Sequence, residues 1–78
     1  MIEIRIVFAG PSMFAGVQSG DRLQLEEGTT VRDVYSRLGV KGSFQHHVVP
    51  YVNGDPRELE YVLSDGDELR PFVPVSGG

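Results

Sequence analysis

A chain of 78 residues can bury one hydrophobic core but not two, so the sequence predicts a single domain. Its formal net charge of −4 and its scattered arginines argue against nucleic acid as a partner, because phosphates require clustered basic residues. It contains no cysteine, which excludes a disulfide, a thiolate metal site and a cysteine nucleophile. No apolar stretch approaches the roughly 18 residues of a membrane span. We therefore expect a cytoplasmic protein that binds neither nucleic acid nor membrane.

The N-terminal half begins with two segments of strand-like alternation. Residues 2–8 place four apolar side chains on one face of an extended chain, namely Ile2, Ile4, Ile6 and Phe8. After a loop with glycine and serine that ends at Gly20, a second alternation puts Leu23 and Leu25 on one face. These two strands could pair as a hairpin with a long loop.

A helix is predicted after the break at Gly28. Thr30 can cap it through its hydroxyl, and Asp33, three residues on, completes a variant capping box. Apolar residues then recur at helical spacing, at Val31, Val34, Tyr35 and Leu38. Gly39 is placed to end the helix in a left-handed conformation, so the helix has at most about three turns.

The segment after the helix has a weaker pattern. Residues 41–47 show no regular periodicity, so we expect irregular structure there. Residues 48–52 are typical of a third strand, in which Pro50 indicates an edge position or a bulge. Residues 53–56 form a cluster of turn-forming residues.

The C-terminal segment completes the element order. A brief fourth strand or a turn of helix is expected near Leu59, and a further turn at residues 65–67. Residues 68–75 are expected to be extended. One helix covering one face of a mixed four- or five-stranded sheet gives an α+β fold.

Two short patterns invite a metal interpretation without supporting it. His46 and His47 are adjacent, and neighbours on an extended chain point to opposite faces, with no third ligand at a recognisable spacing. The acidic residues at 65–68 lack the alternating ligands and closing glutamate of an EF-hand loop. We predict no metal site and no catalytic side chain.

The two terminal glycines are the most informative feature. Gly77 and Gly78 have no side chains to pack, and chance alone gives such a pair roughly once in 200 chains. A narrow end of this kind can thread a channel in a partner enzyme and present its carboxylate there. Adenylation by ATP would activate that carboxylate, and a sulfur nucleophile could then displace AMP and leave a thiocarboxylate.

The whole chain resembles the MoaD/ThiS family of ubiquitin-like sulfur carriers, and MoaD, the small subunit of molybdopterin synthase, in particular. The resemblance rests on Asp-Gly-Asp-Glu at residues 65–68, an apolar strand and the ending Pro-Val-Ser-Gly-Gly at residues 74–78. The helix start at residues 30–31 and the turn at residues 52–54 also fall where that family has theirs. The implied fold is a ubiquitin-like β-grasp domain over residues 1–76, with a flexible diglycine tail.

The resemblance also implies a function. An ATP-dependent, E1-like adenylating enzyme (MoaB/MoeB/ThiF type) would activate Gly78, and a sulfurtransferase would convert it to the thiocarboxylate. The tail would then enter the large molybdopterin synthase subunit (MoaE type) and supply the dithiolene sulfurs of molybdopterin, formed from precursor Z. The chain would bind no cofactor and would act as a non-catalytic, sulfur-donating subunit. The implied site comprises Gly78 as the reacting group, Gly77 and Ser76 in the tail, and Phe72, Val73, Pro74 and Val75 as partner contacts.

Several alternatives stay open at this point. Alternation puts Phe72 with Arg70 on the solvent side, but a bulge at Pro71 or Pro74 would make it a core residue. The loop at residues 39–47 is shorter than in many family members, where a second helix lies. A ThiS-like carrier for thiamin thiazole or another pathway, a ubiquitin-like protein modifier and a plain interaction module are the alternative functions. The lone Lys41 disfavours chain-building by a modifier.

Overall fold

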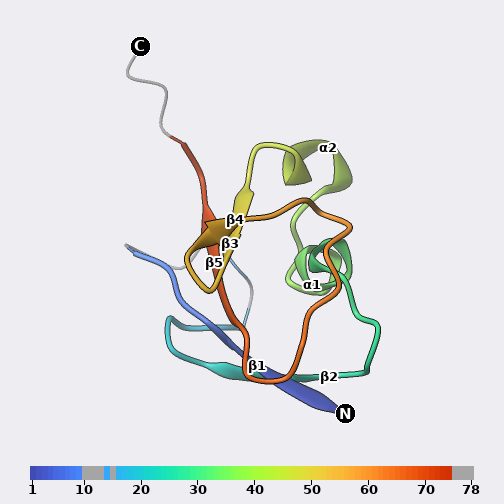
Figure 1. Ribbon diagram of the computed structural model, residues 1–78. Coiled ribbons are helices and arrows are strands. Elements are labelled where there is room, and N and C mark those ends of the chain that lie inside the picture. Colours follow the sequence, from blue (N-terminus) through green and yellow to red (C-terminus); the bar gives the residue numbers. More distant parts are fainter. Residues whose placement is uncertain (10–13, 15, 75–78) are drawn as a thin grey trace.

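The computed structural model describes residues 1–9, 14 and 16–74, which form a mixed sheet and two short helices (Figure 1). The sheet has five strands in the order β2-β1-β5-β3-β4. The strands are β1 (Ile2–Ile6), β2 (Arg22–Leu25), β3 (Val49–Val52), β4 (Asp55–Pro56) and β5 (Glu68–Phe72), and the helices are α1 (Val31–Arg37) and α2 (Gly42–Gln45). The predicted α+β class is confirmed.

Strand β5 is the centre of the sheet. It pairs in parallel with β1, where Ile6 lies beside Leu69, and antiparallel with β3, where Val52 lies beside Leu69. Strand β1 also pairs antiparallel with β2, as the predicted hairpin requires. The last strand in sequence is thus held on both sides.

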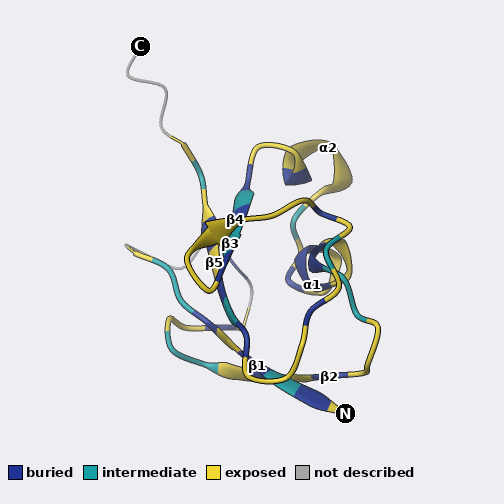
Figure 2. Cartoon of the chain, viewed as in Figure 1, coloured by how far each residue is buried: buried dark blue, intermediate teal, exposed yellow. Residues whose placement is uncertain are grey.

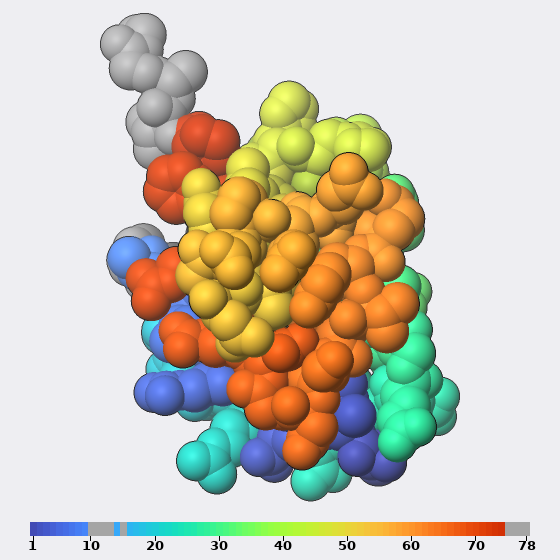
Figure 3. Space-filling model, in the orientation of Figure 1, coloured from blue at the N-terminus to red at the C-terminus, as the bar shows by residue number. Residues whose placement is uncertain are grey.

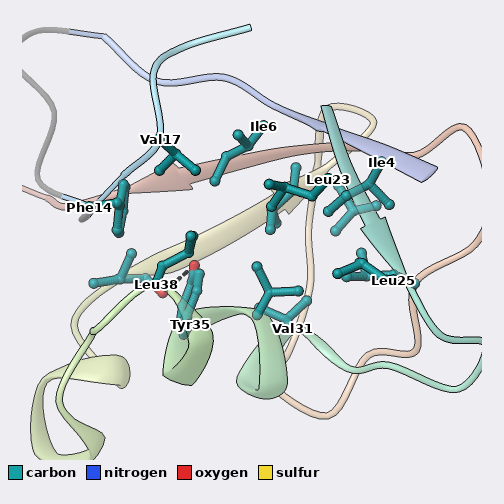
Figure 4. Packing of buried hydrophobic residues seen from close by; sticks show 14 of the residues in the cluster. Ile4, Ile6, Phe14, Val17, Leu23, Leu25, Val31, Tyr35 and Leu38 are labelled. Atoms are coloured by element: carbon teal, nitrogen blue, oxygen red, sulfur yellow. Dashed lines mark hydrogen bonds between the residues drawn. The ribbon is translucent and has the colours of Figure 1, made fainter. Parts of the chain in front are cut away.

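The core lies between α1 and one face of the sheet. Inward side chains alternate along each strand, so that β1 buries Ile2, Ile4 and Ile6 while its other residues face outward (Figure 2). Figure 4 shows these side chains meeting those of the helix, among them Val31, Tyr35 and Leu38. The four apolar residues predicted for the helix face are all buried.

Tyr35 is the largest fully buried side chain of this core. Its hydroxyl donates a hydrogen bond to the carbonyl of Val48, at 3.1 Å (Figure 4). Burial raises the pKa of Tyr35, so the phenol keeps its proton and remains a donor. The bond ties α1 to the residue that precedes β3.

The capping box predicted for α1 is present. The backbone N–H of Asp33 donates to the Thr30 hydroxyl at 3.2 Å, and the backbone N–H of Thr30 donates to the Asp33 carboxylate at 3.0 Å. Hydrogen bonding of the Asp33 carboxylate to the backbone and then the side chain of Thr30 lowers the pKa of Asp33. Gly39 follows the helix with φ of 85°, the left-handed conformation that the sequence predicted.

Replacing Thr30 by alanine should destabilise the fold by about 1 kcal/mol, because one N-terminal N–H of α1 loses its acceptor. Urea unfolding of the two proteins checks this. Because the folded-state pKa of Asp33 is lowered, its ionised carboxylate contributes to the free energy of unfolding above the ordinary aspartate pKa. This contribution is lost as pH falls through the lowered value. Asp33→Asn should lack this acid-dependent loss. Equal stability of wild type and Thr30→Ala would contradict the capping role.

A polar cluster fixes the turn from which β5 starts. The buried carboxylate of Asp67 accepts hydrogen bonds from the Asn53 side-chain amide and the Ser64 backbone N–H, both at 2.8 Å. The Asn53 amide oxygen in turn accepts from the backbone N–H of Glu68 at 2.9 Å. Asn53 and Gly54 both have positive φ, as a two-residue hairpin turn between β3 and β4 requires. This hairpin therefore positions the start of β5.

The structure corrects four predictions about the second half of the chain. Residues 42–45 form α2 where irregular structure was expected, so this loop does carry a short helix. Strand β4 lies at residues 55–56, inside the predicted turn cluster. Near Leu59 the chain forms a turn, in which the Tyr61 N–H donates to the Glu58 carbonyl at 3.0 Å, and an isolated bridge from Val62 to Thr30 in place of a strand or helix. Strand β5 ends at residue 72, before residues 73 and 74 of the predicted extended segment, and residue 75 lies outside the described residues.

Pro50 is the fourth correction. Strand β3 lies between β5 and β4, so Pro50 is not on an edge strand, and its pairing with β5 shows no bulge. Pro50 stands opposite Pro71, and its carbonyl accepts a hydrogen bond from the Arg57 N–H at 2.8 Å. The backbone of Pro50 therefore faces away from β5, and neither proline leaves a donor of the other strand without a partner.

Candidate functional site

The site predicted from the sequence begins where β5 ends. Val73 follows the strand and packs half-buried against the core, and Pro74 is exposed. The remaining predicted site residues, Val75, Ser76, Gly77 and Gly78, lie outside the described residues. The structure therefore places the base of the tail and the surface around it.

Phe72 is on the outer face of the sheet. Leu69 and Pro71 point into the core, while Arg70 and Phe72 point outward, so the alternation continues to the end of the strand. The pairing with β3 runs without interruption from Val52–Leu69 to Val49–Phe72, which rules out the bulge considered above. Phe72 is 49% exposed, far more than a core phenylalanine, and the solvent-side prediction for it is confirmed.

Tyr51 forms an aromatic pair with Phe72. The ring centroids are 6.2 Å apart with an interplanar angle of 83°, an edge-to-face arrangement. Arg70 stands directly opposite Tyr51 across the β3–β5 pairing, and the three side chains line one shallow hollow. We call these three residues the sheet-face patch. Sequence reasoning found Phe72 but missed Tyr51, because only the register of β3 against β5 brings Tyr51 beside it.

Arg70 gives the patch a charged edge. Its guanidinium lies 3.7 Å from the Glu68 carboxylate, and both side chains are substantially exposed. An exposed ion pair of this kind contributes at most about 1 kcal/mol, so Arg70 can exchange this partner for another carboxylate. The patch can therefore offer an apolar contact and a charge-assisted hydrogen bond together.

The two histidines lie apart from this patch. His47 packs at 5.7 Å from Phe44, ring centroid to ring centroid, and His46 ends α2. Within residues 1–9, 14 and 16–74, no three His, Cys, Asp or Glu side chains are grouped closely enough to hold a metal ion. Neither helix of the described chain is long and apolar enough to cross a membrane.

The comparison with protein families concerns almost the whole chain, including the tail. The model of the ThiS family matches residues 6–78. This chain belongs to the ThiS family. The match includes the terminal glycines as well as the strands that support them, so the family resemblance seen in the sequence is confirmed.

Solved structures show the same fold. A Pyrococcus furiosus protein assigned as molybdopterin converting factor, subunit 1, is 24% identical with a TM-score of 0.73, over 96% of this chain and 100% of that one. SAMP1 from Haloferax volcanii is 24% identical with a TM-score of 0.71, over 97% of this chain and 99% of its own. The comparison with curated proteins gives no match. The ubiquitin-like β-grasp fold expected from the resemblance is confirmed.

Proposed function

We propose that this member of the ThiS family is a sulfur carrier whose reacting group is the carboxylate of Gly78. The observation that carries the proposal is the family match, which runs through Gly77 and Gly78 to residue 78. The position of β5 supports it, because the central strand of the sheet leads directly into that tail. The rest of the domain then serves to present the tail to partner enzymes.

The chemistry needs only the terminal carboxylate from this chain. In the proposed scheme an E1-like adenylating enzyme lets a carboxylate oxygen of Gly78 attack the α-phosphorus of ATP, and pyrophosphate leaves. Sulfide attacks the acyl carbon of the adenylate directly, or a sulfurtransferase persulfide attacks it and a second thiol then cleaves the resulting acyl disulfide. AMP leaves and the thiocarboxylate remains on Gly78. The catalytic groups come from the partners, and the carrier itself holds no cofactor.

The sheet-face patch is the contact that we propose for these partners. Exposed aromatic side chains beside a reactive terminus are typical anchors of protein interfaces, which are enriched in tyrosine, phenylalanine and arginine. Tyr51 and Phe72 already hold each other edge-to-face, so little side-chain freedom is lost when a partner covers them. Val73 and Pro74 continue from the patch into the tail, so one partner could contact patch and tail together.

Molybdopterin synthesis is the pathway that we propose for the sulfur. The ending Pro-Val-Ser-Gly-Gly supports a role as small subunit beside a large molybdopterin synthase subunit, which would receive the tail. The Pyrococcus furiosus protein assigned as molybdopterin converting factor, subunit 1, has the same fold, which is consistent with this role. At 24% identity this likeness supports the fold and not the function. A ThiS-like carrier for another pathway would use the same tail chemistry, as would a protein modifier up to the adenylate.

The test is the intact mass of the native-ended chain after incubation with ATP, sulfide and an E1-like enzyme that is active on its own carrier. We expect a gain equal to the exchange of one oxygen for one sulfur, located on Gly78 by fragmentation. Omitting ATP should remove the gain. An unchanged mass would contradict the carrier function, and higher-mass adducts on lysines of other proteins would favour the modifier instead. Transfer of the sulfur to precursor Z by the large subunit would identify the pathway.

A further inference from the structure

The charges of this acidic protein are distributed unevenly along the chain. None of its 11 acidic residues lies between residues 34 and 54, a segment that carries Arg37, Lys41, His46 and His47. This segment comprises most of α1, all of α2 and strand β3. In space, however, Glu58 and Glu60 line one pocket together with His46, so the surface around α2 is not uniformly basic.

A separate apolar groove opens beside α2, and the described residues that line it include Lys41 and no acidic residue. Its lining includes Phe14 and Val48, which are buried, Val40, which is half-buried, and Phe44, which is 45% exposed. The floor is therefore apolar, and the exposed rim carries Phe44 together with Lys41. We call this feature the α2 groove. No ion pair of Lys41 occurs among the described residues, so its ammonium group is available to a partner.

The α2 groove lies at the end of the molecule from which the tail leaves. Val48, which lines the groove, directly precedes Val49, and Val49 pairs with Phe72 at the end of β5. Figure 1 shows α2 and the end of β5 at the same end of the fold, and Figure 3 shows the α2 segment projecting there. The exposed large hydrophobic residues of the described chain are Met1, Phe44, Val62 and Phe72. Two of them belong to these elements, since Phe44 is part of α2 and Phe72 ends β5.

We propose that the α2 groove is a second docking surface for the enzyme that adenylates the tail. It takes an apolar side chain of that enzyme, with a carboxylate beside it that pairs with Lys41. This inference rests on the proposed function, since it assumes a partner that receives the tail. The apolar floor selects a protein segment, and the Lys41 ammonium group, with no acidic residue among the described lining residues, favours an acidic one.

Two surfaces around one tail have a physical advantage. The sheet-face patch and the α2 groove are on separate sides of the tail base, so contact with both fixes the direction in which the tail enters its channel. Contact with the patch alone would leave the carrier free to pivot about it. The second contact thus lowers the orientational cost of bringing the carboxylate to the nucleotide.

The test uses ATP–pyrophosphate exchange by the E1-like enzyme of the same organism, measured over a range of carrier concentrations. Phe44→Ala and Lys41→Glu should each raise the KM for the carrier by about 5- to 10-fold. Both variants should change KM and leave kcat unchanged, because these contacts form before the chemical step and persist through it. Lys41→Arg should restore most of the affinity lost in Lys41→Glu, and added salt should narrow the difference between Lys41→Glu and wild type.

Val62→Ala is the matched control, because Val62 is 52% exposed and lies away from the tail base, at the bridge to Thr30. Its KM should equal that of wild type, and the thermal midpoints of all variants should agree. Wild-type KM in both Phe44→Ala and Lys41→Glu, with a raised KM in Phe72→Ala, would overturn the α2 groove and leave the proposed function standing. No exchange with the wild-type carrier would overturn the proposed function itself.

Discussion

A chain that lacks Gly77 and Gly78 should fold normally and accept no sulfur. The core is built from residues between Ile2 and Leu69, and the last described residue with a packing role is Val73. Deletion therefore removes no buried apolar surface, and the thermal midpoint should stay unchanged. The same deletion moves the terminal carboxylate back to Ser76, two residues short of the position that the adenylating enzyme must reach, so thiocarboxylate formation should be lost completely.

Circular dichroism on heating and intact mass after the sulfur-loading reaction measure the two parts of this prediction. Gly78→Ala is the matched control, because it keeps the chain length and the carboxylate but adds a Cβ. Its loading should be strongly slowed if the tail threads a channel too narrow for a side chain. Unfolding of the deletion variant, or sulfur loading at an unchanged rate, would refute the assignment of Gly78 as the reacting group.

Leu69→Ala should remove most of the stability of the fold. Leu69 is completely buried in the central strand, between Ile6 of β1 and Val52 of β3. Truncation of such a leucine costs about 2–5 kcal/mol, from lost burial and from the cavity left behind. A domain of this size has only about 3–5 kcal/mol to lose, so much of the variant population should be unfolded at room temperature.

Urea unfolding monitored by circular dichroism checks this expectation. Arg70→Ala is the control from the same strand, since its side chain faces solvent and its ion pair with Glu68 is exposed. That control should change the free energy of unfolding by no more than about 0.5 kcal/mol. A Leu69→Ala variant as stable as Arg70→Ala would mean that β5 is not the centre of the core.

The elements with local signals could be predicted from the sequence. Helix α1 has its capping residues, its apolar spacing and its terminal glycine within ten consecutive positions, and all three signals were correct. Strand β1 could be predicted in the same way, from strict alternation at Ile2, Ile4 and Ile6. These signals depend on contacts between near neighbours, so they survive in a single sequence.

The missed elements are too short to carry a periodic pattern. Helix α2 has four residues and no side-chain hydrogen bond at its N-cap Lys41, so nothing local marks its start. Strand β4 has two residues and exists through its pairing with Tyr51 and Val52 of β3. Pro50 was wrongly predicted to lie on an edge strand or at a bulge. A proline is tolerated here because Pro71 stands opposite it, and only the register of the two strands shows this.

The candidate site also contains one residue that could be predicted from the sequence and others that could not. The outward position of Phe72 could be predicted, because it depends on alternation along one strand. Tyr51 beside it could not, because it lies 21 positions earlier in the sequence and only the pairing of β3 with β5 brings the two rings together. Phe44 had no periodic signal at all, since it belongs to a helix that the sequence did not reveal.

The central position of β5 has a mechanical consequence. A partner that draws the tail into a channel applies tension along the axis of this strand. Hydrogen bonds run across that axis on both sides, from the Val7 N–H to the Leu69 carbonyl at 3.0 Å and from the Asn53 N–H to the Glu68 carbonyl at 2.9 Å. Tension therefore loads two ladders in shear at once, whereas an edge strand would resist the same pull through one ladder alone. A partner can therefore pull on the tail without separating β5 from the sheet.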